Sequence, residues 1–290
     1  MISFSNHVDG LEAIFRKVDE NQDLTKEDAV KLLSIDSHSS EFYALLAKAN
    51  ELSRREYGRK GYVFAQIGLN STPCTGNCKF CSLARDSFVV EEKTEKPLED
   101  ILAEASRAVE QKADALFLMT TADYGVERFL EVSGEVKKLL TPEMMFIANI
   151  GDFGLETAKR LKEVGYTGVY HIVRMNEGED TDLPKEQRIA TLDAIKAAGL
   201  ELIYCVEPIG PEHTYEQIAD EMLRAREYGV NVMACMKRVG VPGTPLFDKG
   251  EITDLELTKI VAAARLVTRP KQSMNVHEPK QMALLAGVNQ

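Results

Sequence analysis

The stretch YVFAQIGLNSTPCTGNCKFC, residues 62–81, decides how this chain folds. Its first part, Tyr62–Leu69, is a short apolar run that predicts a strand. Three cysteines follow directly in the spacing C-x3-C-x2-C. After this stretch, short apolar runs alternate with longer amphipathic segments, separated by short connections. Such alternation predicts an α/β protein with parallel strands, specifically a TIM-type (β/α) barrel.

Seven strands and seven helices are predicted from residue 62 onwards. The strands are expected at Tyr62–Leu69, Ala115–Met119, Met145–Ile150, Gly168–Val173, Leu200–Val206, Val230–Met236 and Ser273–Val276. The helices are expected at Leu98–Gln111, Val126–Leu139, Leu155–Val164, Lys185–Ala198, Tyr215–Tyr228, Asp254–Thr268 and Pro279–Ala286. An eighth strand would begin at Gly287, so either the barrel is incomplete or the sequence is shortened.

Residues 1–60 predict an N-terminal helical extension ahead of one barrel domain at 61–290. Leu11, Ile14, Phe15 and Val18 recur at helical spacing and predict a first helix. A third helix is expected at about Ser40–Tyr57. Thr25 and Asp28 are spaced to cap a second helix. No linker, repeat or low-complexity tract divides the rest of the chain.

Composition excludes several classes of protein. The chain has 290 residues, 44% of them hydrophobic, and a net charge of −11, which disfavours nucleic acids and anionic membranes as partners. No run of about 18 apolar residues exists, and Met1–Gly10 lacks a signal-peptide core. We therefore expect a cytoplasmic protein whose five cysteines are metal ligands, catalytic groups or buried fillers rather than disulfides.

The cysteine loop has the spacing of an iron–sulfur site. Cys74, Cys78 and Cys81 can ligate three irons of a cubane cluster, and Pro73 and Gly76 let the loop curl around it. The fourth iron stays open and can chelate the amino and carboxylate groups of an amino acid. A zinc site would want a fourth Cys or His nearby, and a redox C-x2-C would need only two cysteines on a different supersecondary unit.

The loop closely resembles the signature of the radical S-adenosylmethionine (SAM) superfamily, including the aromatic Phe80 before the last cysteine. The resemblance implies a [4Fe-4S] cluster on Cys74, Cys78 and Cys81, with SAM bound at the open iron. It also implies reductive cleavage of SAM to a 5′-deoxyadenosyl radical that abstracts hydrogen from an unactivated C–H bond. Phe80 is then expected against the adenine.

Candidates for SAM binding follow at the carboxyl ends of the predicted strands, where barrels gather their functional groups. Thr120 begins a segment, TTAD, that departs from the family's Gly-Gly-Glu-like sequence, so hydroxyls or backbone carbonyls are expected to bind the SAM amino group there. Asn149 is a candidate for the ribose or the substrate.

The fourth strand is followed by a charged segment. Arg174 is a candidate for a bidentate contact with the SAM carboxylate, and Glu177 for accepting hydrogen bonds from the ribose or the amino group. A surface ion pair is the alternative. Arg188 is a second carboxylate-binding candidate, and His171 is expected to be structural rather than a catalytic base.

Two later segments resemble family sequences that contact adenine. Ile209, with Gly210 and Glu212, matches G-x-I-x-G-x-x-E except that Glu207 replaces the first glycine. The run from Val239 to Leu246 resembles the corresponding loop of biotin synthase, whose backbone meets adenine.

Most of the chain resembles the biotin synthase-related group of this superfamily. The resemblance rests on residues 24–33, 74–81, 197–200, 243–246 and 286–289. The group includes biotin synthase, archaeal-type lipoyl synthases, methylornithine synthase and a related hydrogenase maturase.

Two further cysteines bear on the reaction. Biotin synthase carries a second cluster held by three cysteines and an arginine, of which only the Cys205 position matches here; Thr120 or Thr121 and Ala148 stand at two others. Cys235 is an added cysteine on the next predicted strand. If both point inward, a second, differently ligated iron–sulfur cluster is expected, completed by His, Glu or a small thiol; the alternative is that both fill space.

The resemblance leaves three functions open, and no catalytic residue is assigned. A second cluster favours a sulfurtransferase that inserts sulfur in biotin- or lipoyl-type synthesis. Its absence favours rearrangement or cleavage of a small amino-acid-like substrate, as in methylornithine synthase. A non-catalytic cluster scaffold is the third. Expected partners are a small-molecule or acyl-carrier-bound substrate and an electron donor such as flavodoxin or ferredoxin, and a homodimer is compatible with the sequence.

Overall fold

The computed structural model describes residues 9–290 of the chain. These residues form two compact units. The loop unit comprises residues 62–204 and 238–250, and the terminal unit comprises 9–61, 205–237 and 251–290. Within residues 9–290, no helix is both long enough and apolar enough to cross a membrane.

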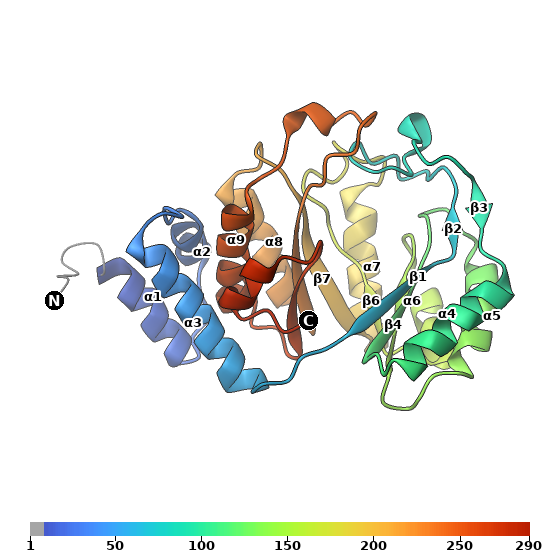
Figure 1. Ribbon diagram of the computed structural model, residues 1–290, viewed down its shortest axis with the longest axis horizontal. Helices are drawn as coiled ribbons and strands as arrows, with labels where there is room; N and C mark the ends of the chain where they lie inside the picture. Colours follow the sequence, from blue (N-terminus) through green and yellow to red (C-terminus); the bar gives the residue numbers. More distant parts are fainter. Residues whose placement is uncertain (1–8) are drawn as a thin grey trace. The chain divides into compact units, whose positions relative to one another are not determined.

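The loop unit is a parallel α/β structure (Figure 1). Four strands pair in chain order: β1 (Phe64–Gly68), β4 (Ala115–Met119), β5 (Met145–Asn149) and β6 (Gly168–Tyr170). The last of them pairs with the start of β7 (Glu201–Ile209). The strands β4, β5 and β6 are short apolar runs that are buried over most of their length, whereas β1 exposes Gln66 and Gly68.

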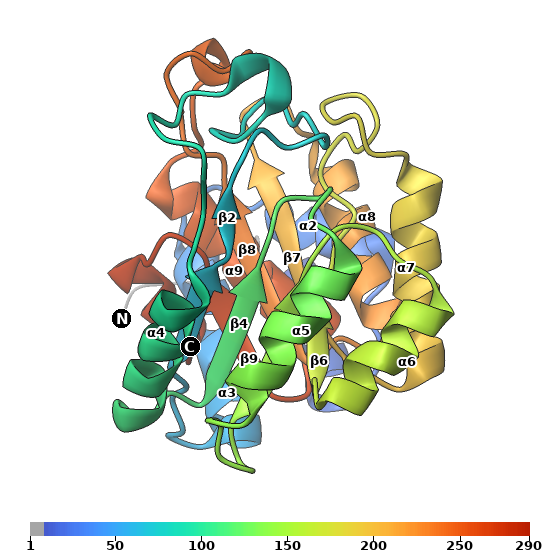
Figure 2. The ribbon, with the colours of Figure 1, turned by 90° about the vertical axis from the view of Figure 1, so that its right-hand side faces the viewer.

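Helices connect the strands of the loop unit. They are α4 (Leu98–Glu110), α5 (Val126–Lys137), α6 (Leu155–Val164) and α7 (Lys185–Ala198). Figure 2 shows α4, α5 and α6 along the face of the sheet next to β4. The α6 and α7 helices end at Gly165 and Gly199, both in the left-handed conformation that glycine adopts without strain. Because the strands are parallel, their carboxyl ends meet at one edge of the sheet, and the cysteine loop leaves β1 at that edge.

Short elements flank that loop. The strands β2 (Asn70–Ser71) and β3 (Thr94–Glu95) pair in an antiparallel sense before and after it, and a 3₁₀ turn, η1, covers Arg85–Ser87. Neither strand was expected, because two-residue strands carry no hydrophobic period.

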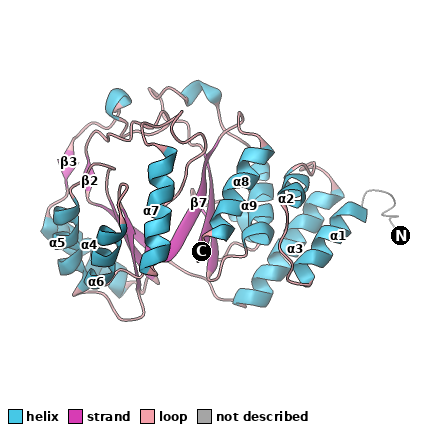
Figure 3. Cartoon of the chain, turned by 180° about the vertical axis from the view of Figure 1, so that it is seen from behind, coloured by secondary structure: helices cyan, strands magenta, loops and turns pink. Residues whose placement is uncertain are grey.

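The terminal unit combines both ends of the described chain. Its helices are α1 (Asp9–Asp19), α2 (Lys26–Leu33), α3 (Ser40–Tyr57), α8 (Tyr215–Glu227), α9 (Asp254–Thr268) and the 3₁₀ helix η3 (Gln281–Ala286). Its strands are β8 (Val232–Lys237) and β9 (Ser273–Val276), whereas the 3₁₀ helix η2 (Phe247–Lys249) belongs to the loop unit. Figure 3 shows α2 and α3 beside α8 and α9, and α3 also packs on η3. The helical extension thus packs on α8, α9 and η3 of the same unit, and the division at residue 60 stays a prediction. The predicted cap of α2 is confirmed: Thr25 and Asp28 form a capping box.

All pairings of the main sheet are parallel where their register is resolved, and its order is β1-β4-β5-β6-β7-β8-β9. The strand β7 continues from one unit into the other. The parallel α/β prediction is confirmed, with most bounds within two or three residues. The predicted helix Pro279–Ala286 is instead a 3₁₀ helix that begins at Gln281. Residues 287–290 form no strand in the described chain. Asn289 instead hydrogen-bonds to β9, donating its backbone N–H to the Met274 carbonyl at 3.1 Å.

Candidate active site at the three-cysteine loop

The cysteine loop is closed by its own backbone hydrogen bonds. The Cys74 N–H donates to the Leu83 carbonyl at 2.7 Å, and the Arg85 N–H donates back to the Cys74 carbonyl at 3.1 Å. Within the loop, the Cys81 N–H donates to the Cys78 carbonyl at 3.0 Å. The three cysteines are therefore held on one short turn directly after β1 and β2.

Two of the sulfurs have backbone donors beside them. The Ala122 N–H lies 3.3 Å from Cys74 Sγ, and the Leu83 N–H lies 3.4 Å from Cys81 Sγ. Such N–H groups stabilise negative charge on sulfur ligands and tune the clusters they hold. The first donor comes from the end of β4, which ties that strand end to the loop.

Cys78 differs from its two partners because it is buried. Burial raises the pKa of its thiol to about 12, although the positive charge of Arg174 acts in the opposite direction. A thiol in this state becomes a thiolate when a bound metal replaces its proton. This sulfur is therefore suited to a metal ligand and not to a free nucleophile.

The loop is closely packed at Gly76. A side-chain carbon on Gly76 would lie 3.5 Å from Cys74 Sγ and 3.3 Å from Leu183 Cδ1. The Gly76 carbonyl accepts from the Asp182 N–H at 2.9 Å, and the Asn77 side chain donates to Asp182 Oδ2 at 3.0 Å. The loop is thus anchored to the segment after β6.

The spacing of the three sulfurs fits a cluster better than one metal ion. Among residues 9–290, one group of three Cys, His, Asp or Glu ligands has all its ligand atoms within 4.8 Å of one another, and it does not contain Cys74, Cys78 or Cys81. A single ion requires such close ligands, whereas a cubane holds each ligand on a different iron. The residues present therefore fit a cubane cluster.

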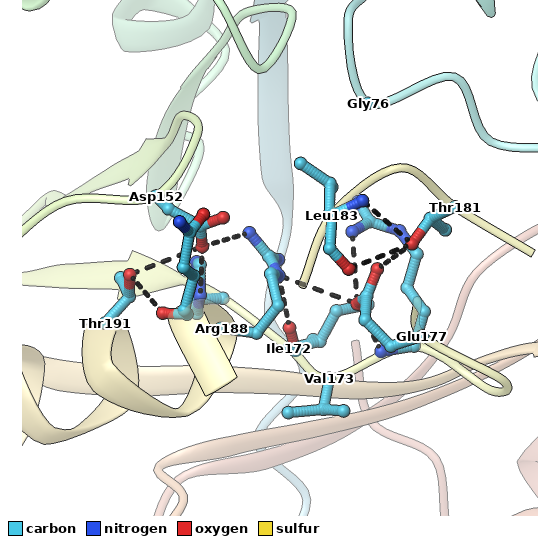
Figure 4. Close-up of polar contacts among 12 residues, drawn as sticks. Gly76, Asp152, Ile172, Val173, Glu177, Thr181, Leu183, Arg188 and Thr191 are labelled. Atoms are coloured by element: carbon cyan, nitrogen blue, oxygen red, sulfur yellow. Dashed lines mark hydrogen bonds and ion pairs between the residues drawn. The ribbon is translucent and has the colours of Figure 1, made fainter. Parts of the chain in front are cut away.

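A buried charge network lies beside this loop (Figure 4). Glu177 Oε2 accepts from the Arg174 backbone N–H at 2.8 Å and lies 3.6 Å from Arg188 Nε and 3.7 Å from Arg174 Nη1. The other oxygen, Oε1, accepts from the Thr181 hydroxyl at 2.7 Å. The charges of both Arg174 and Glu177 act on Cys78, so the structure brings these predicted residues together with the cluster loop.

Arg188 is engaged on several sides. It donates from Nε to the Ile172 carbonyl at 3.0 Å and from Nη1 to Asp152 Oδ1 at 2.9 Å, and it is 4% exposed. The arrangement favours a positioning role for Arg188, which holds Glu177 and Asp152, over direct contact with a cofactor carboxylate.

His171 is buried next to the same network. Burial, together with the positive charge of Arg188, lowers the pKa of His171 to about 3. Its Nε2 lies 3.4 Å from Asp152 Oδ1. Burial acts to raise the pKa of Asp152, but His171 and Arg188 together hold it below its ordinary value. A neutral, buried imidazole of this kind agrees with the structural role expected for His171.

The ends of β4 and β5 place the next predicted residues. Thr121 and Asn70 pair reciprocally, with Asn70 Nδ2 donating to Thr121 Oγ1 at 2.8 Å and the Thr121 N–H donating to Asn70 Oδ1 at 3.0 Å. The Thr120 N–H donates to the Asn149 carbonyl at 3.0 Å, so these two candidates are adjacent. A cavity of about 300 Å³ is lined by Asn70, Thr72, Glu95, Thr121, Asp123, Tyr124, Gly125 and Arg128.

The segment from Val239 to Leu246 also reaches the cysteine loop. The Leu246 N–H donates to the Lys79 carbonyl at 3.0 Å, and Thr244 turns the segment by donating its hydroxyl to the Val241 carbonyl at 2.7 Å. Phe80 is half-buried and Val239 is exposed. Phe80 lies on the loop itself, and the contact of Phe80 and Val239 with adenine stays a prediction.

The remaining predicted residues belong to the terminal unit. Ile209 ends β7 and is buried. Cys205 and Cys235 are both fully buried. The structure groups Cys205 with Glu207 and His277, and Cys235 is outside that group. The assignment of both cysteines to a second cluster stays a prediction.

Sequence reasoning missed Asp152, Thr181 and Gly151. Asp152 follows the end of β5 closely, which was a usable signal. Gly151 lies against the Ala122 carbonyl, where an added side-chain carbon would come within 2.0 Å of the oxygen. That constraint depends on the tertiary approach of two strand ends and has no local signal.

Comparison with known proteins shows the family of this chain. A family model described as the Radical SAM superfamily matches residues 71–255. The biotin synthase of Acetivibrio thermocellus is 27% identical over 273 residues, covering 90% of this chain and 82% of that protein. The biotin synthase of Persephonella marina is 23% identical over 266 residues, covering 89% and 78%.

Solved structures share the fold. A methylornithine synthase structure has a TM-score of 0.81 at 19% identity and covers 95% of this chain and 84% of that chain. The FeFe-hydrogenase maturase HydG of Carboxydothermus hydrogenoformans has a TM-score of 0.80 at 17% identity, covering 97% and 69%.

The fold and the loop define a parallel (β/α) barrel-type protein with a three-cysteine loop whose residues fit a cubane cluster. More particularly, because the family model spans more than half of its length, this chain belongs to the radical SAM superfamily.

Proposed function

We propose that this protein reductively cleaves SAM with a [4Fe-4S] cluster held by Cys74, Cys78 and Cys81. When bound, the cluster and SAM supply a 5′-deoxyadenosyl radical that abstracts hydrogen from an unactivated C–H bond. The observation that carries the proposal is the closed loop in which N–H donors face two sulfurs and Arg174 and Glu177 lie beside the third. The protein's part is to bind, orient and shield these groups.

Specific residues of the loop unit have roles in that binding. Arg174 donates to the SAM carboxylate, and Glu177, held by Arg188, accepts from the amino group or the ribose. Thr120 and Asn149 are polar contacts at the ends of β4 and β5. Phe80 and Val239 are proposed to contact the adenine.

Anaerobic incubation with dithionite and SAM tests the proposal. We expect 5′-deoxyadenosine to form, detected by liquid chromatography with mass spectrometry. If none forms with a fully loaded cluster and candidate substrates present, the protein is a scaffold and the proposal is wrong. Replacing dithionite with reduced flavodoxin or ferredoxin tests the expected electron donor in the same assay.

Within this chemistry we propose two candidate reactions, of which the first is sulfur insertion into a small-molecule or acyl-carrier-bound substrate, as a sulfurtransferase of biotin or lipoyl type. Support comes from the curated relatives, which are biotin synthases at 23–27% identity over most of the chain. The sulfur donor would be a second iron–sulfur cluster, for which the sequence offers Cys205 and Cys235, the two cysteines outside the loop. The structure places Cys205, but not Cys235, with two other ligand side chains. About eight irons per chain, rather than about four, would support it.

A second candidate is radical rearrangement or cleavage of an amino-acid-like substrate without sulfur insertion. One observation favours it: Cys205 is grouped with a carboxylate and an imidazole rather than with Cys235. About four irons per chain, with 5′-deoxyadenosine formation intact, would support this candidate over the first.

A further inference from the structure

The terminal unit contains a second set of metal-ligating side chains: Cys205, Glu207 and His277. All three ligand atoms lie within 4.8 Å of one another, and no other such set occurs among residues 9–290. Glu207 Oε2 and His277 Nδ1 are 3.7 Å apart. The set combines a thiol, a carboxyl group and an imidazole, three side chains that bind transition metals.

The backbone explains why these side chains converge. Cys205 and Glu207 are two residues apart on β7, so strand alternation puts them on the same face. His277 follows β9 directly, and its N–H donates to the Cys235 carbonyl at 3.1 Å. That bond continues the parallel ladder of β8 and β9 by one step, so His277 is held as if it were part of the strand.

The same ladder separates Cys235 from the set. Cys235 is in register with Val276, the residue before His277. In parallel strands, residues in register share a face and consecutive residues alternate. The Cys235 and His277 side chains therefore project to opposite faces of the sheet, which agrees with the absence of Cys235 from the set.

We propose that Cys205, Glu207 and His277 bind one divalent transition metal ion of the zinc or ferrous class. Metal–ligand bonds of about 2.0–2.3 Å in tetrahedral geometry place the ligand atoms roughly 3.3–3.8 Å apart, which suits this set. A cubane would spread its ligands over different irons. Thiolate and imidazole also select zinc or iron over magnesium or calcium, which prefer oxygen ligands alone.

Burial leaves a place for a fourth ligand. Cys205 is fully buried, whereas the Glu207 and His277 side chains are 15% and 20% exposed. Three protein ligands with one open position are the pattern of metal sites that bind a water or a substrate group. The ligand class expected there is a small molecule with a thiol or carboxylate group.

This inference goes beyond the proposed function, because the site does not depend on SAM cleavage. It also bears on the choice between the two candidate reactions. A single ion on Cys205 takes up the cysteine that a sulfur-donating cluster would need, and so favours the reaction without sulfur insertion.

Cobalt binding provides the direct test. The probe is Co²⁺ added to the full chain in which Cys74, Cys78 and Cys81 are replaced by alanine, so that absorption arises from the second site alone. We expect one equivalent to bind, with a thiolate-to-cobalt charge-transfer band and the visible bands of tetrahedral cobalt. The further change Cys205→Ala should abolish the charge-transfer band, and Glu207→Gln or His277→Ala should weaken binding by about tenfold or more.

Cys235→Ala is the matched control, because it removes a buried cysteine from the neighbouring strand and should leave the cobalt spectrum unchanged. Far-ultraviolet circular dichroism checks that each variant is folded. No cobalt uptake by the folded chain, or an unchanged spectrum in Cys205→Ala, or equal loss in Cys235→Ala, overturns the proposal.

Metal analysis of the reconstituted wild-type protein separates this site from the proposed function. About four irons with sulfide plus one further metal ion, lost in Cys205→Ala, supports the single-ion site. About eight irons that fall to about four in Cys205→Ala overturns it in favour of a second cluster. A lack of 5′-deoxyadenosine in the same preparation overturns the proposed function but leaves the metal result standing.

Discussion

At the scale of single residues, Cys78 is the buried member of the three-cysteine loop, and only a bound metal keeps its sulfur as a thiolate. We predict that Cys78→Ala abolishes SAM cleavage and lowers the iron content from about four per chain to near zero. Iron analysis, visible absorption and 5′-deoxyadenosine formation measure the effect. Ser82→Ala, next to the loop's last cysteine, is the control; retained cleavage in Cys78→Ala would contradict the ligand assignment.

Glu177 is a carboxylate whose two oxygens are both occupied by buried partners. We predict that Glu177→Gln lowers the free energy of unfolding by about 1–3 kcal/mol, because Arg188 loses a charged partner in a buried site. Urea unfolding followed by circular dichroism measures the change. SAM affinity should also fall, as seen by equilibrium dialysis with labelled SAM.

The control for this carboxylate is Glu179→Gln, two residues further on and exposed. It should change the unfolding free energy by less than about 0.5 kcal/mol. Equal effects in the two variants would show that the Glu177 network contributes nothing specific.

At the scale of secondary-structure elements, the close approach of the β4 and β5 ends depends on Gly151. A methyl group there would come within 2.0 Å of the Ala122 carbonyl oxygen. The backbone N–H of the same residue, Ala122, donates to Cys74 Sγ. We predict that Gly151→Ala costs about 1–3 kcal/mol of stability and alters the cluster's visible spectrum. Thermal unfolding and absorption spectra test both effects.

Gly154→Ala makes the same change three residues later, where nothing lies within 4 Å of the added carbon. It should leave both stability and spectrum close to those of the unchanged protein. A normal spectrum in Gly151→Ala would mean that the strand end does not position the loop.

The elements show what the sequence could predict. Leu155–Val164, Lys185–Ala198 and Asp254–Thr268 form helices with the predicted bounds, because apolar period and capping signals agree there. Strand β7 extends three residues past its predicted end at Val206. Glu207 and Pro208 are residue types that are uncommon in strands, so the sequence pattern ends before the strand does. The pair β2 and β3 was missed, because long-range contact alone creates it.

The site divides in the same way. The cysteine loop was predictable, since its ligands lie within eight residues and their spacing carries the chemistry. His277 was not singled out, because it meets Cys205 only through the order of the strands. The ligand types expected to complete a cluster on Cys205 and Cys235 were His, Glu or a small thiol.

At the scale of the whole molecule, stability should depend on pH through His171. Burial lowers its pKa to about 3 in the folded protein, whereas the unfolded chain has a value of about 6.5. Between these values the unfolded state binds one more proton, so stability is full above about pH 6.5 and falls as the pH drops toward 3. Asp152, whose pKa is lowered from 3.8, adds to this loss only at the acid end.

We predict a loss of about 2 kcal/mol between pH 7.5 and pH 5 from His171. Urea unfolding at the two pH values measures it. His171→Asn, which cannot titrate, should remove most of the difference. An equal pH dependence in the variant would assign the effect to other groups.

The packing of α3 against the end of the chain constrains how the protein is made. Ser53 donates its hydroxyl to the Gly287 carbonyl at 2.6 Å, and Asn50 donates to the Leu284 carbonyl at 3.1 Å. These partners are more than 230 residues apart in the sequence. During synthesis α3 leaves the ribosome long before its partners exist, whereas residues 62–204 contain most of their own unit. The surroundings of the cysteine loop can therefore assemble early. The apolar face of α3 is covered only after residues 284–287 have been synthesised.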